Sequence, residues 1–253
     1  MIVTFLGTGT SQGVPVIACE CDVCRSIDFR DKRTRSSIHI DVEGKSLVID
    51  TGPDFRTQML RERIKHLDAI LFTHEHKDHT AGMDDVRSFN FSQKIDMPVY
   101  ADERVIDQLK KEFSYVFAEK KYPGVPSIEV HTIDKADFSI AGTTITPIEV
   151  MHYKLPVFGF RINDFTYITD ANYISEEEIE KIKGSKVLVL NALQKTDHIS
   201  HFTLDQAVKM VKRIKPEKAY FTHISHKLGK QRDVEVELPE NCHLAFDGLK
   251  VHL

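Results

Sequence analysis

The sequence has no apolar run approaching the roughly 20 residues that a membrane-spanning helix needs, although 41% of its 253 residues are hydrophobic. The apolar residues come instead in short segments, as in a chain that buries a substantial core of strands and helices. The N-terminus lacks the charged and long apolar regions of a secretory signal. We therefore expect a cytoplasmic protein without a membrane partner.

An excess of positive charge is also absent. The 34 Lys and Arg residues are outnumbered by 38 Asp and Glu residues, which gives a net charge of −4 with neutral histidines. Nucleic-acid binding usually requires a basic field or patch. We therefore do not expect nucleic acid as a partner. No low-complexity tract or short-period repeat divides the chain, and its length suits a single domain covering residues 1–253.

Cysteine is scarce, and its distribution does not suit a disulfide framework. Three of the four cysteines, Cys19, Cys21 and Cys24, crowd into six residues, whereas disulfide-rich secreted chains have spaced and paired cysteines. This spacing indicates either a reduced, metal-binding cluster or three incidental thiols, and the spacing alone leaves both open. Cys242 lies outside the cluster and is expected to be an ordinary strand residue.

The apolar segments predict alternating strands and helices in two similar halves. In the first half, strands are expected at 2–6, 36–42, 45–50, 69–72 and 98–100, with helices at 54–64, from 82 onwards, and at 102–113. In the second half, strands are expected at 128–132, 137–140, 143–150, 158–162, 165–170, 187–191 and 219–222, with helices at 176–183 and 204–214.

A cluster of metal-binding residue types follows the predicted strand 69–72. It consists of His74, His76, Asp78 and His79. Because an extended chain presents residues i and i+2 on one face, His74 and His76 can converge on one ion. Asp78 and His79 lie on the following turn and point to the position of a second ion. The alternative is a solvated polar loop. Further histidines and aspartates at later strand ends favour the metal site over this alternative.

Those later residues are His152, Asp170 and His223, each at the end of a predicted strand. A single histidine at a strand end is more often structural than a ligand. Their repeated position at strand ends nevertheless suits a site built at one edge of a sheet structure.

The run from His74 to His79 resembles the H-x-H-x-D-H signature of the metallo-β-lactamase superfamily, and the flanking segments extend the resemblance over nearly the whole chain. The PhnP-like phosphodiesterases are the most similar members, and tRNase Z is more distant. The resemblance implies an α/β fold, an αββα sandwich of two similar halves with a two-metal hydrolase site at one edge. Asp50-Thr51-Gly52 resembles the D-x-G turn, whose carboxylate supports the metal ligands from behind.

The same resemblance implies a division of ligands between two ions. One ion would be held by His74, His76 and His152, the other by Asp78, His79 and His223, and Asp170 would bridge them. No cysteine occupies this set, and zinc, manganese or iron would suit it. A separate structural zinc would be held by Cys19, Cys21, Cys24 and His226, because four protein ligands leave no open position.

The segment His201-Phe202-Thr203 resembles the H-x-T element of tRNase Z and its phosphodiesterase relatives. The resemblance implies that His201 lies over the substrate phosphate, either as a proton donor or to stabilise charge, and that Asp78 shares in catalysis. The alternative role of His201 is to cap the helix at 204–214 or to pack against the loop. His198 is expected to be a surface residue.

The function these features favour is a metal-dependent phosphodiesterase that uses hydroxide activated at a dinuclear metal centre. Its expected substrate is a small nucleotide-like or sugar phosphate diester, with a cyclic diester as the leading option. The alternatives are a tRNA 3′-end processing endonuclease, against which the chain shows no long glycine- and proline-rich arm, and a non-catalytic metal-binding scaffold. β-Lactam or glutathione thioester hydrolysis is less well supported. The oligomeric state is open, with a homodimer as one option.

Overall fold

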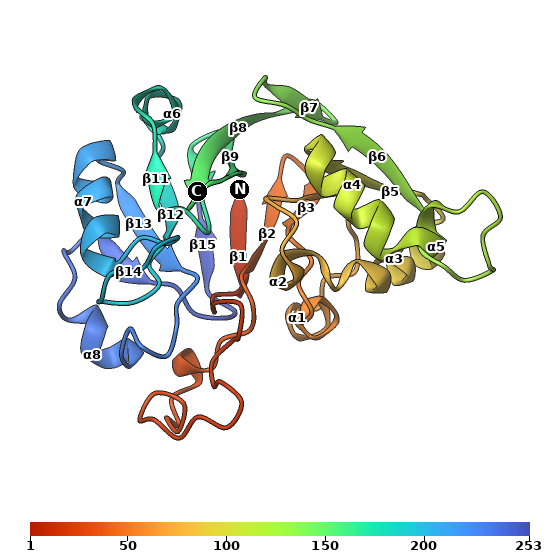
Figure 1. Ribbon diagram of the computed structural model, residues 1–253. Helices are drawn as coiled ribbons and strands as arrows, with labels where there is room; N and C mark the ends of the chain where they lie inside the picture. The colour runs from red at the N-terminus through yellow and green to blue at the C-terminus, as the bar shows by residue number, and fades with distance from the viewer.

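The computed structural model describes residues 1–253. Its strands form two sheets, and helices lie along their outer sides (Figure 1). The first sheet has seven strands in the order β15-β1-β2-β3-β4-β5-β6. Their bounds are β1 Ile2–Gly7, β2 Ser37–Val42, β3 Lys45–Ile49, β4 Ala69–Leu71, β5 Met97–Ala101, β6 Ile128–Thr132 and β15 Lys250–His252.

The second sheet has eight strands in the order β11-β8-β9-β10-β12-β13-β14, with β7 paired to β8. Their bounds are β7 Phe138–Ile140, β8 Thr143–His152, β9 Leu155–Ile162, β10 Phe165–Tyr167, β11 Tyr173–Ile174, β12 Val187–Asn191, β13 Lys218–Thr222 and β14 Cys242–Leu244.

The helices are short, and the longer ones cover the two sheets. Near the first sheet lie α1 Phe55–Glu62, α3 Arg87–Gln93 and α4 Glu103–Glu112, and near the second lie α6 Glu176–Ile182 and α7 Leu204–Ile214 (Figure 1). The remaining helices are α2 Lys77–Thr80, α5 Ser114–Phe117, α8 Gln231–Glu235 and the 3₁₀ turns η1 Phe29–Asp31 and η2 Met83–Val86. None of the helices is long and apolar enough to cross a membrane.

Three apolar layers hold these elements together. The layer between the sheets includes Ile38 and Phe160, the layer under α1, α3 and α4 includes Ile70, and the layer under α6 and α7 includes Leu188. Strands with both faces buried in this way read as continuous apolar runs, as in 187–191. The arrangement confirms the predicted αββα sandwich.

Parallel pairing brings distant segments to one edge. In the first sheet β3 pairs in parallel with β4, and in the second β10 pairs in parallel with β12 and β12 with β13. Parallel strands end on the same side, so the residues that follow them meet there. Asp50 follows β3, His74 lies just beyond β4, Asp170 just beyond β10, and His223 directly after β13.

Most predicted elements are present, with differences at their ends. Strand β8 continues to His152 instead of ending at residue 150, because the antiparallel pairing with β9 runs on to the pair His152 and Leu155. The segment 165–170 is a strand only to Tyr167. The helix expected from residue 82 starts as the 3₁₀ turn η2 before α3 begins. The elements β11, β14, β15, α5 and α8 were not predicted, because each spans five residues or fewer and carries little periodicity.

The turn after β3 packs directly against the loop that carries the histidine cluster. A Cβ atom added to Gly52 would lie 2.1 Å from the carbonyl oxygen of Asp78, and one added to Gly82 would lie 2.1 Å from the carbonyl oxygen of Gly52. The backbone of Thr51 donates to the carbonyl of His79 over 2.8 Å. Glycine is therefore required at residues 52 and 82 by close backbone approach.

We expect Gly52→Ala to lower the free energy of unfolding by about 1–3 kcal/mol, since the new methyl group must displace the backbone at Asp78. It should also weaken metal binding. Gly44→Ala is the matched control, because a Cβ at Gly44 meets no atom within 4 Å. Its positive φ means that any loss of stability comes from strain in the hairpin turn itself, and metal binding should not change. Denaturant unfolding and metal titration would check both variants. Unchanged metal binding by Gly52→Ala would contradict the tight coupling of the two loops.

Candidate metal centres

All seven predicted ligands of the catalytic site lie at the shared strand edge. His74, His76 and His152 offer ligand atoms within 4.8 Å of one another, and so do Asp78, His79, Asp170 and His223. The structure thus brings together two adjoining groups with the predicted membership, and Asp170 lies among the second. That these residues bind metal stays a prediction.

In the first group, the nitrogen atoms are free to face a common point. His74 Nε2 lies 3.0 Å from His76 Nδ1, and the His152 ring centre lies 5.1 Å from that of His76. His152 Nδ1 donates to the carbonyl oxygen of Ser200 over 2.9 Å. This bond keeps the hydrogen on Nδ1, so Nε2 of His152 has a lone pair for an ion.

The second group contains a buried nitrogen that the protein does not satisfy. His79 Nε2 has no hydrogen-bond partner, yet it lies 3.2 Å from Asp78 Oδ2 and 3.3 Å from Asp170 Oδ2. His223 Nε2 lies 3.2 Å from the other oxygen of Asp170. Imidazole nitrogens and carboxylate oxygens turned toward one another in this way fit a divalent cation between them.

Electrostatics favour positive charge at this position. Burial opposes the charge of Asp170, but His223 and His79 outweigh it and hold the pKa of Asp170 well below its usual range. Burial lowers the pKa of His223 to about 4 and that of His74 well below 6.5. The pKa of His79 is raised well above 6.5, because the surrounding carboxylates, chiefly Asp78, overcome its burial. A proton or a metal ion can supply the positive charge these carboxylates favour.

Asp50 supports the site from behind. Its carboxylate accepts hydrogen bonds from the backbone and hydroxyl of Thr73, over 2.9 and 2.8 Å, and from Nδ1 of His79 over 2.7 Å. The last bond fixes the ring of His79 with Nε2 toward Asp78 and Asp170. This is the role that the D-x-G resemblance implies for Asp50.

Three site residues have a strained backbone. Asp50, Asp170 and His223 have φ angles of 66°, 58° and 55°, in the left-handed region that costs a non-glycine residue of order 1–3 kcal/mol. Each lies where the chain leaves a strand and turns at the edge. Strain of this kind persists only where the surrounding structure imposes it, and it clusters at functional sites.

His201 lies against the Asp170 carboxylate. Its Nε2 is 3.1 Å from Asp170 Oδ1, its ring stacks on that of His223 with centres 4.9 Å apart, and the residue is 8% exposed. It does not cap the following helix, because Thr203 caps α7 in a reciprocal pair with Gln206. The capping alternative for His201 is therefore wrong.

His201 could also act as a ligand, since it lies close enough to His152 and Asp170 to share an ion with them. The metal content of a His201 variant separates this role from a role above the substrate phosphate.

The structure shows a contact that the sequence interpretation missed. His198 is exposed, as expected, but its Nδ1 lies 3.1 Å from Nδ1 of His201 and 3.3 Å from the hydroxyl of Ser200. The three-residue spacing ahead of His201 was the only signal in the sequence. It was weak, because a loop of unknown conformation connects the two histidines.

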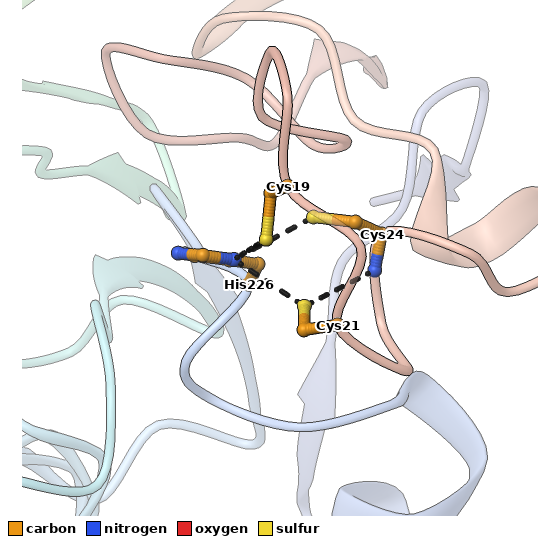
Figure 2. A group of neighbouring side chains, drawn as sticks. All are labelled: Cys19, Cys21, Cys24 and His226. Carbon is orange, nitrogen blue, oxygen red and sulfur yellow. Dashed lines mark hydrogen bonds between the residues drawn. The ribbon is translucent and has the colours of Figure 1, made fainter.

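The cysteine cluster meets His226, three residues beyond His223. Figure 2 shows the three cysteines of the N-terminal loop around the His226 ring. The sulfur atoms of Cys19, Cys21 and Cys24 lie 3.2, 3.4 and 3.5 Å from His226 Nδ1. Sulfur and nitrogen ligands of a tetrahedral zinc are separated by roughly 3.5 Å. The four residues therefore fit a Cys₃His zinc site, which stays a prediction.

Two of these thiols differ strongly in acidity. A hydrogen bond from the backbone of Cys24 lowers the pKa of Cys21 to about 6. Burial raises the pKa of Cys24 to about 11. Zinc binds thiolates, so Cys21 is already in the binding form at pH 7, and a metal ion would have to displace a proton from Cys24.

Comparisons with a family model and with solved structures point to the same family. Residues 45–224 match a family model described as a Beta-lactamase superfamily domain. A crystal structure described as a new diphosphatase from the PhnP family is 39% identical, with a TM-score of 0.93, and covers 100% of this chain and 97% of that chain. Zinc-bound PqqB from Methylobacterium extorquens is 19% identical, with a TM-score of 0.80 and full coverage of both chains, and supports the fold alone.

One relative has a different name. An octanoyltransferase from Porphyromonas gingivalis (strain ATCC BAA-308 / W83) is 39% identical over 249 residues, which are 97% of this chain and 50% of that protein. The chain spans about half the length of the first curated relatives it matches. The name therefore describes a protein with a further half that this chain does not match.

For the cysteine cluster, we expect iodoacetamide to alkylate Cys21 at least about tenfold faster than Cys24 at pH 7 in zinc-free protein, because the pKa of Cys21 is lowered and that of Cys24 is raised. Zinc should protect both. Cys242 is the internal control, since it lies buried outside the cluster. Mass spectrometry of the digested protein measures each site.

The same zinc assignment predicts that Cys21→Ser lowers zinc content and the melting temperature, because bound metal adds to the free energy of folding. Full zinc content and an unchanged melting temperature in this variant would rule out the Cys₃His site.

Proposed function

This chain belongs to the β-lactamase superfamily of metal-dependent hydrolases, and from this premise we propose that it hydrolyses small phosphodiesters. The proposed substrates are nucleotide-like or sugar phosphate diesters, with a cyclic diester as the leading candidate. The observation that carries the proposal is the pair of adjoining ligand groups at the strand edge, with His201 close to His152 of the first and Asp170 of the second.

The residues that would hold the two ions are the seven histidines and aspartates at the strand edge. When bound, divalent ions there would activate water and neutralise charge on a phosphoryl oxygen. Asp50 orients His79, and the Ser200 carbonyl orients His152. The chain thus prearranges these rings before substrate arrives, which lowers the cost of organising the site. Zinc, manganese and iron all remain compatible with histidine and carboxylate ligands.

We propose that His201 donates a proton to the leaving group. A poor alkoxide needs a proton as it departs, and histidine is the side chain with an unperturbed pKa closest to neutrality. Its Nε2 lies at the edge of the ligand groups, while Nδ1 contacts Ser200 and His198 on the opposite side of the ring. The alternative within this proposal is that His201 stabilises charge on the phosphoryl group.

The relatives suggest two other activities. The PhnP-family structure is described as a diphosphatase, and cleavage of a diphosphate linkage would use the same ligand groups. Octanoyl transfer is a weaker candidate, because the chain matches only 50% of the protein with that name, and the paired His and Asp groups suit metal-activated water. We therefore propose phosphoryl rather than acyl chemistry.

We expect purified protein to hydrolyse bis(p-nitrophenyl) phosphate when zinc or manganese is added. Asp170→Ala should lose more than about 100-fold in kcat, which exceeds the usual cost of removing a supporting partner, and should bind less metal. Asp205→Asn, an exposed carboxylate on α7, is the control. Absence of turnover with any of zinc, manganese or iron, while the protein binds metal, would favour the scaffold alternative.

His201→Ala should lose about 10² to 10⁴ in kcat on a diester with an alkyl leaving group, as general acid catalysis typically contributes. The loss should be smaller on a p-nitrophenyl ester, whose leaving group departs without a proton, and metal content should not change. His252→Ala, an exposed histidine on β15, is the control. Equal losses on both esters indicate charge stabilisation, reduced metal content indicates a ligand, and wild-type rates on both remove His201 from the mechanism.

A further inference from the structure

The turn next to His152 contains a residue that such a turn does not favour. Strands β8 and β9 are joined by two residues, Tyr153 and Lys154. Tyr153 has a φ of 58°. Two-residue hairpin turns that need a positive φ at this position are usually built with Gly, Asn or Asp, and a bulky side chain there is an outlier. The strained tyrosine needs a reason beyond the turn itself.

Asn172 fixes this turn to the loop that carries His201. The backbone of Tyr153 donates to Asn172 Oδ1 over 2.8 Å, and Asn172 Nδ2 donates to the carbonyl oxygen of Ile199 over 3.0 Å. The Asn172 backbone also donates to the Met151 carbonyl over 2.8 Å. One asparagine side chain therefore joins two loops that border the strand edge, and it holds the tyrosine in its strained conformation.

Two large apolar side chains remain exposed around this asparagine. Tyr153 is 48% exposed and Ile199 is 67% exposed. Tyr153 directly follows His152, and Ile199 directly precedes Ser200, whose carbonyl accepts the hydrogen bond of His152. We call Tyr153, Lys154 and Ile199 the rim. It lies beside the first group of candidate ligands, within two residues of the His152 and Ser200 contact.

Lys154 adds positive charge to this rim. Its ammonium lies 5.3 Å from the centre of the Tyr153 ring, a cation–π distance. The lysine ammonium suits an anionic group of a ligand, and the aromatic face suits a planar group. A nucleotide has an anionic phosphate and a planar base, and every nucleobase has a π face that stacks on aromatic side chains. A bare sugar phosphate has no such face.

We propose that Tyr153 is a specificity-determining residue that stacks on the nucleobase of a nucleotide-type phosphodiester, with Lys154 and Ile199 completing the rim. The inference rests on the proposed phosphodiesterase function and narrows its substrate class to nucleotides. The strain at Tyr153 is then the cost of presenting an aromatic ring directly beside a metal-ligand histidine.

Two esters with the same leaving group test this proposal. Thymidine 5′-(p-nitrophenyl) phosphate carries a base, and methyl p-nitrophenyl phosphate does not. Tyr153→Gly should raise KM for the thymidine ester by about tenfold or more relative to its effect on KM for the methyl ester. Tyr153→Phe should behave as wild type. Because glycine relieves the strained turn, Tyr153→Gly should fold with an equal or higher melting temperature.

Asn163→Gly is the matched control, since Asn163 also has a positive φ, of 52°, in the two-residue turn between β9 and β10. It should leave both esters unchanged. Equal effects of Tyr153→Gly on the two esters, or no effect on either, would overturn the proposal.

A binding measurement separates this proposal from the proposed function. In metal-free wild-type protein, saturation-transfer NMR should detect contact with the thymine protons of thymidine 5′-monophosphate, and the signal should disappear in Tyr153→Gly. If the wild type hydrolyses neither ester but this signal is present and depends on Tyr153, the phosphodiesterase function fails and the base contact stands. If the signal is absent or survives in Tyr153→Gly, the base contact fails.

Discussion

The Asp170 carboxylate lies within 3.3 Å of ring nitrogens from three histidines that reach it on different chain segments, His79, His201 and His223. It is 2% exposed, and a buried carboxylate is costly unless positive charge or hydrogen bonds surround it. The edge of the sandwich is therefore built around one anion. All three rings present Nε2 to Asp170. They differ in what meets Nδ1, which is Asp50 for His79, Ser36 for His223 and Ser200 for His201.

The positions of the candidate ligands could be predicted from the sequence because they obey a local rule. Each lies at or just beyond the end of an apolar strand. Parallel pairing carries most of these ends to one edge, and His152 reaches it at the end of the antiparallel strand β8. His74 and His76 are also close in sequence, so their convergence needs only an extended chain. The fold followed from the same apolar pattern together with the resemblance to the superfamily.

Other parts of the site depend on loops that meet only in the folded chain. The contact between His198 and His201 and the bridge made by Asn172 both require a loop conformation that no periodicity encodes. The left-handed conformation of Asp170 and His223 was equally invisible, since the sequence contains none of the glycines that usually mark it at these positions. Short edge strands such as β11 were missed for the same lack of pattern.

The two candidate ions would draw their ligands from both sheets, since His74, His76, Asp78 and His79 follow β4 of the first sheet and His152, Asp170 and His223 belong to the second. Binding at that edge is then thermodynamically linked to the packing of one sheet on the other. An ion that binds only when the two sheets are packed together stabilises that packing by an amount that grows with the logarithm of the free metal concentration. The resistance of this chain to proteolysis would then vary with the metal supply of the cell, even under conditions in which no substrate is present.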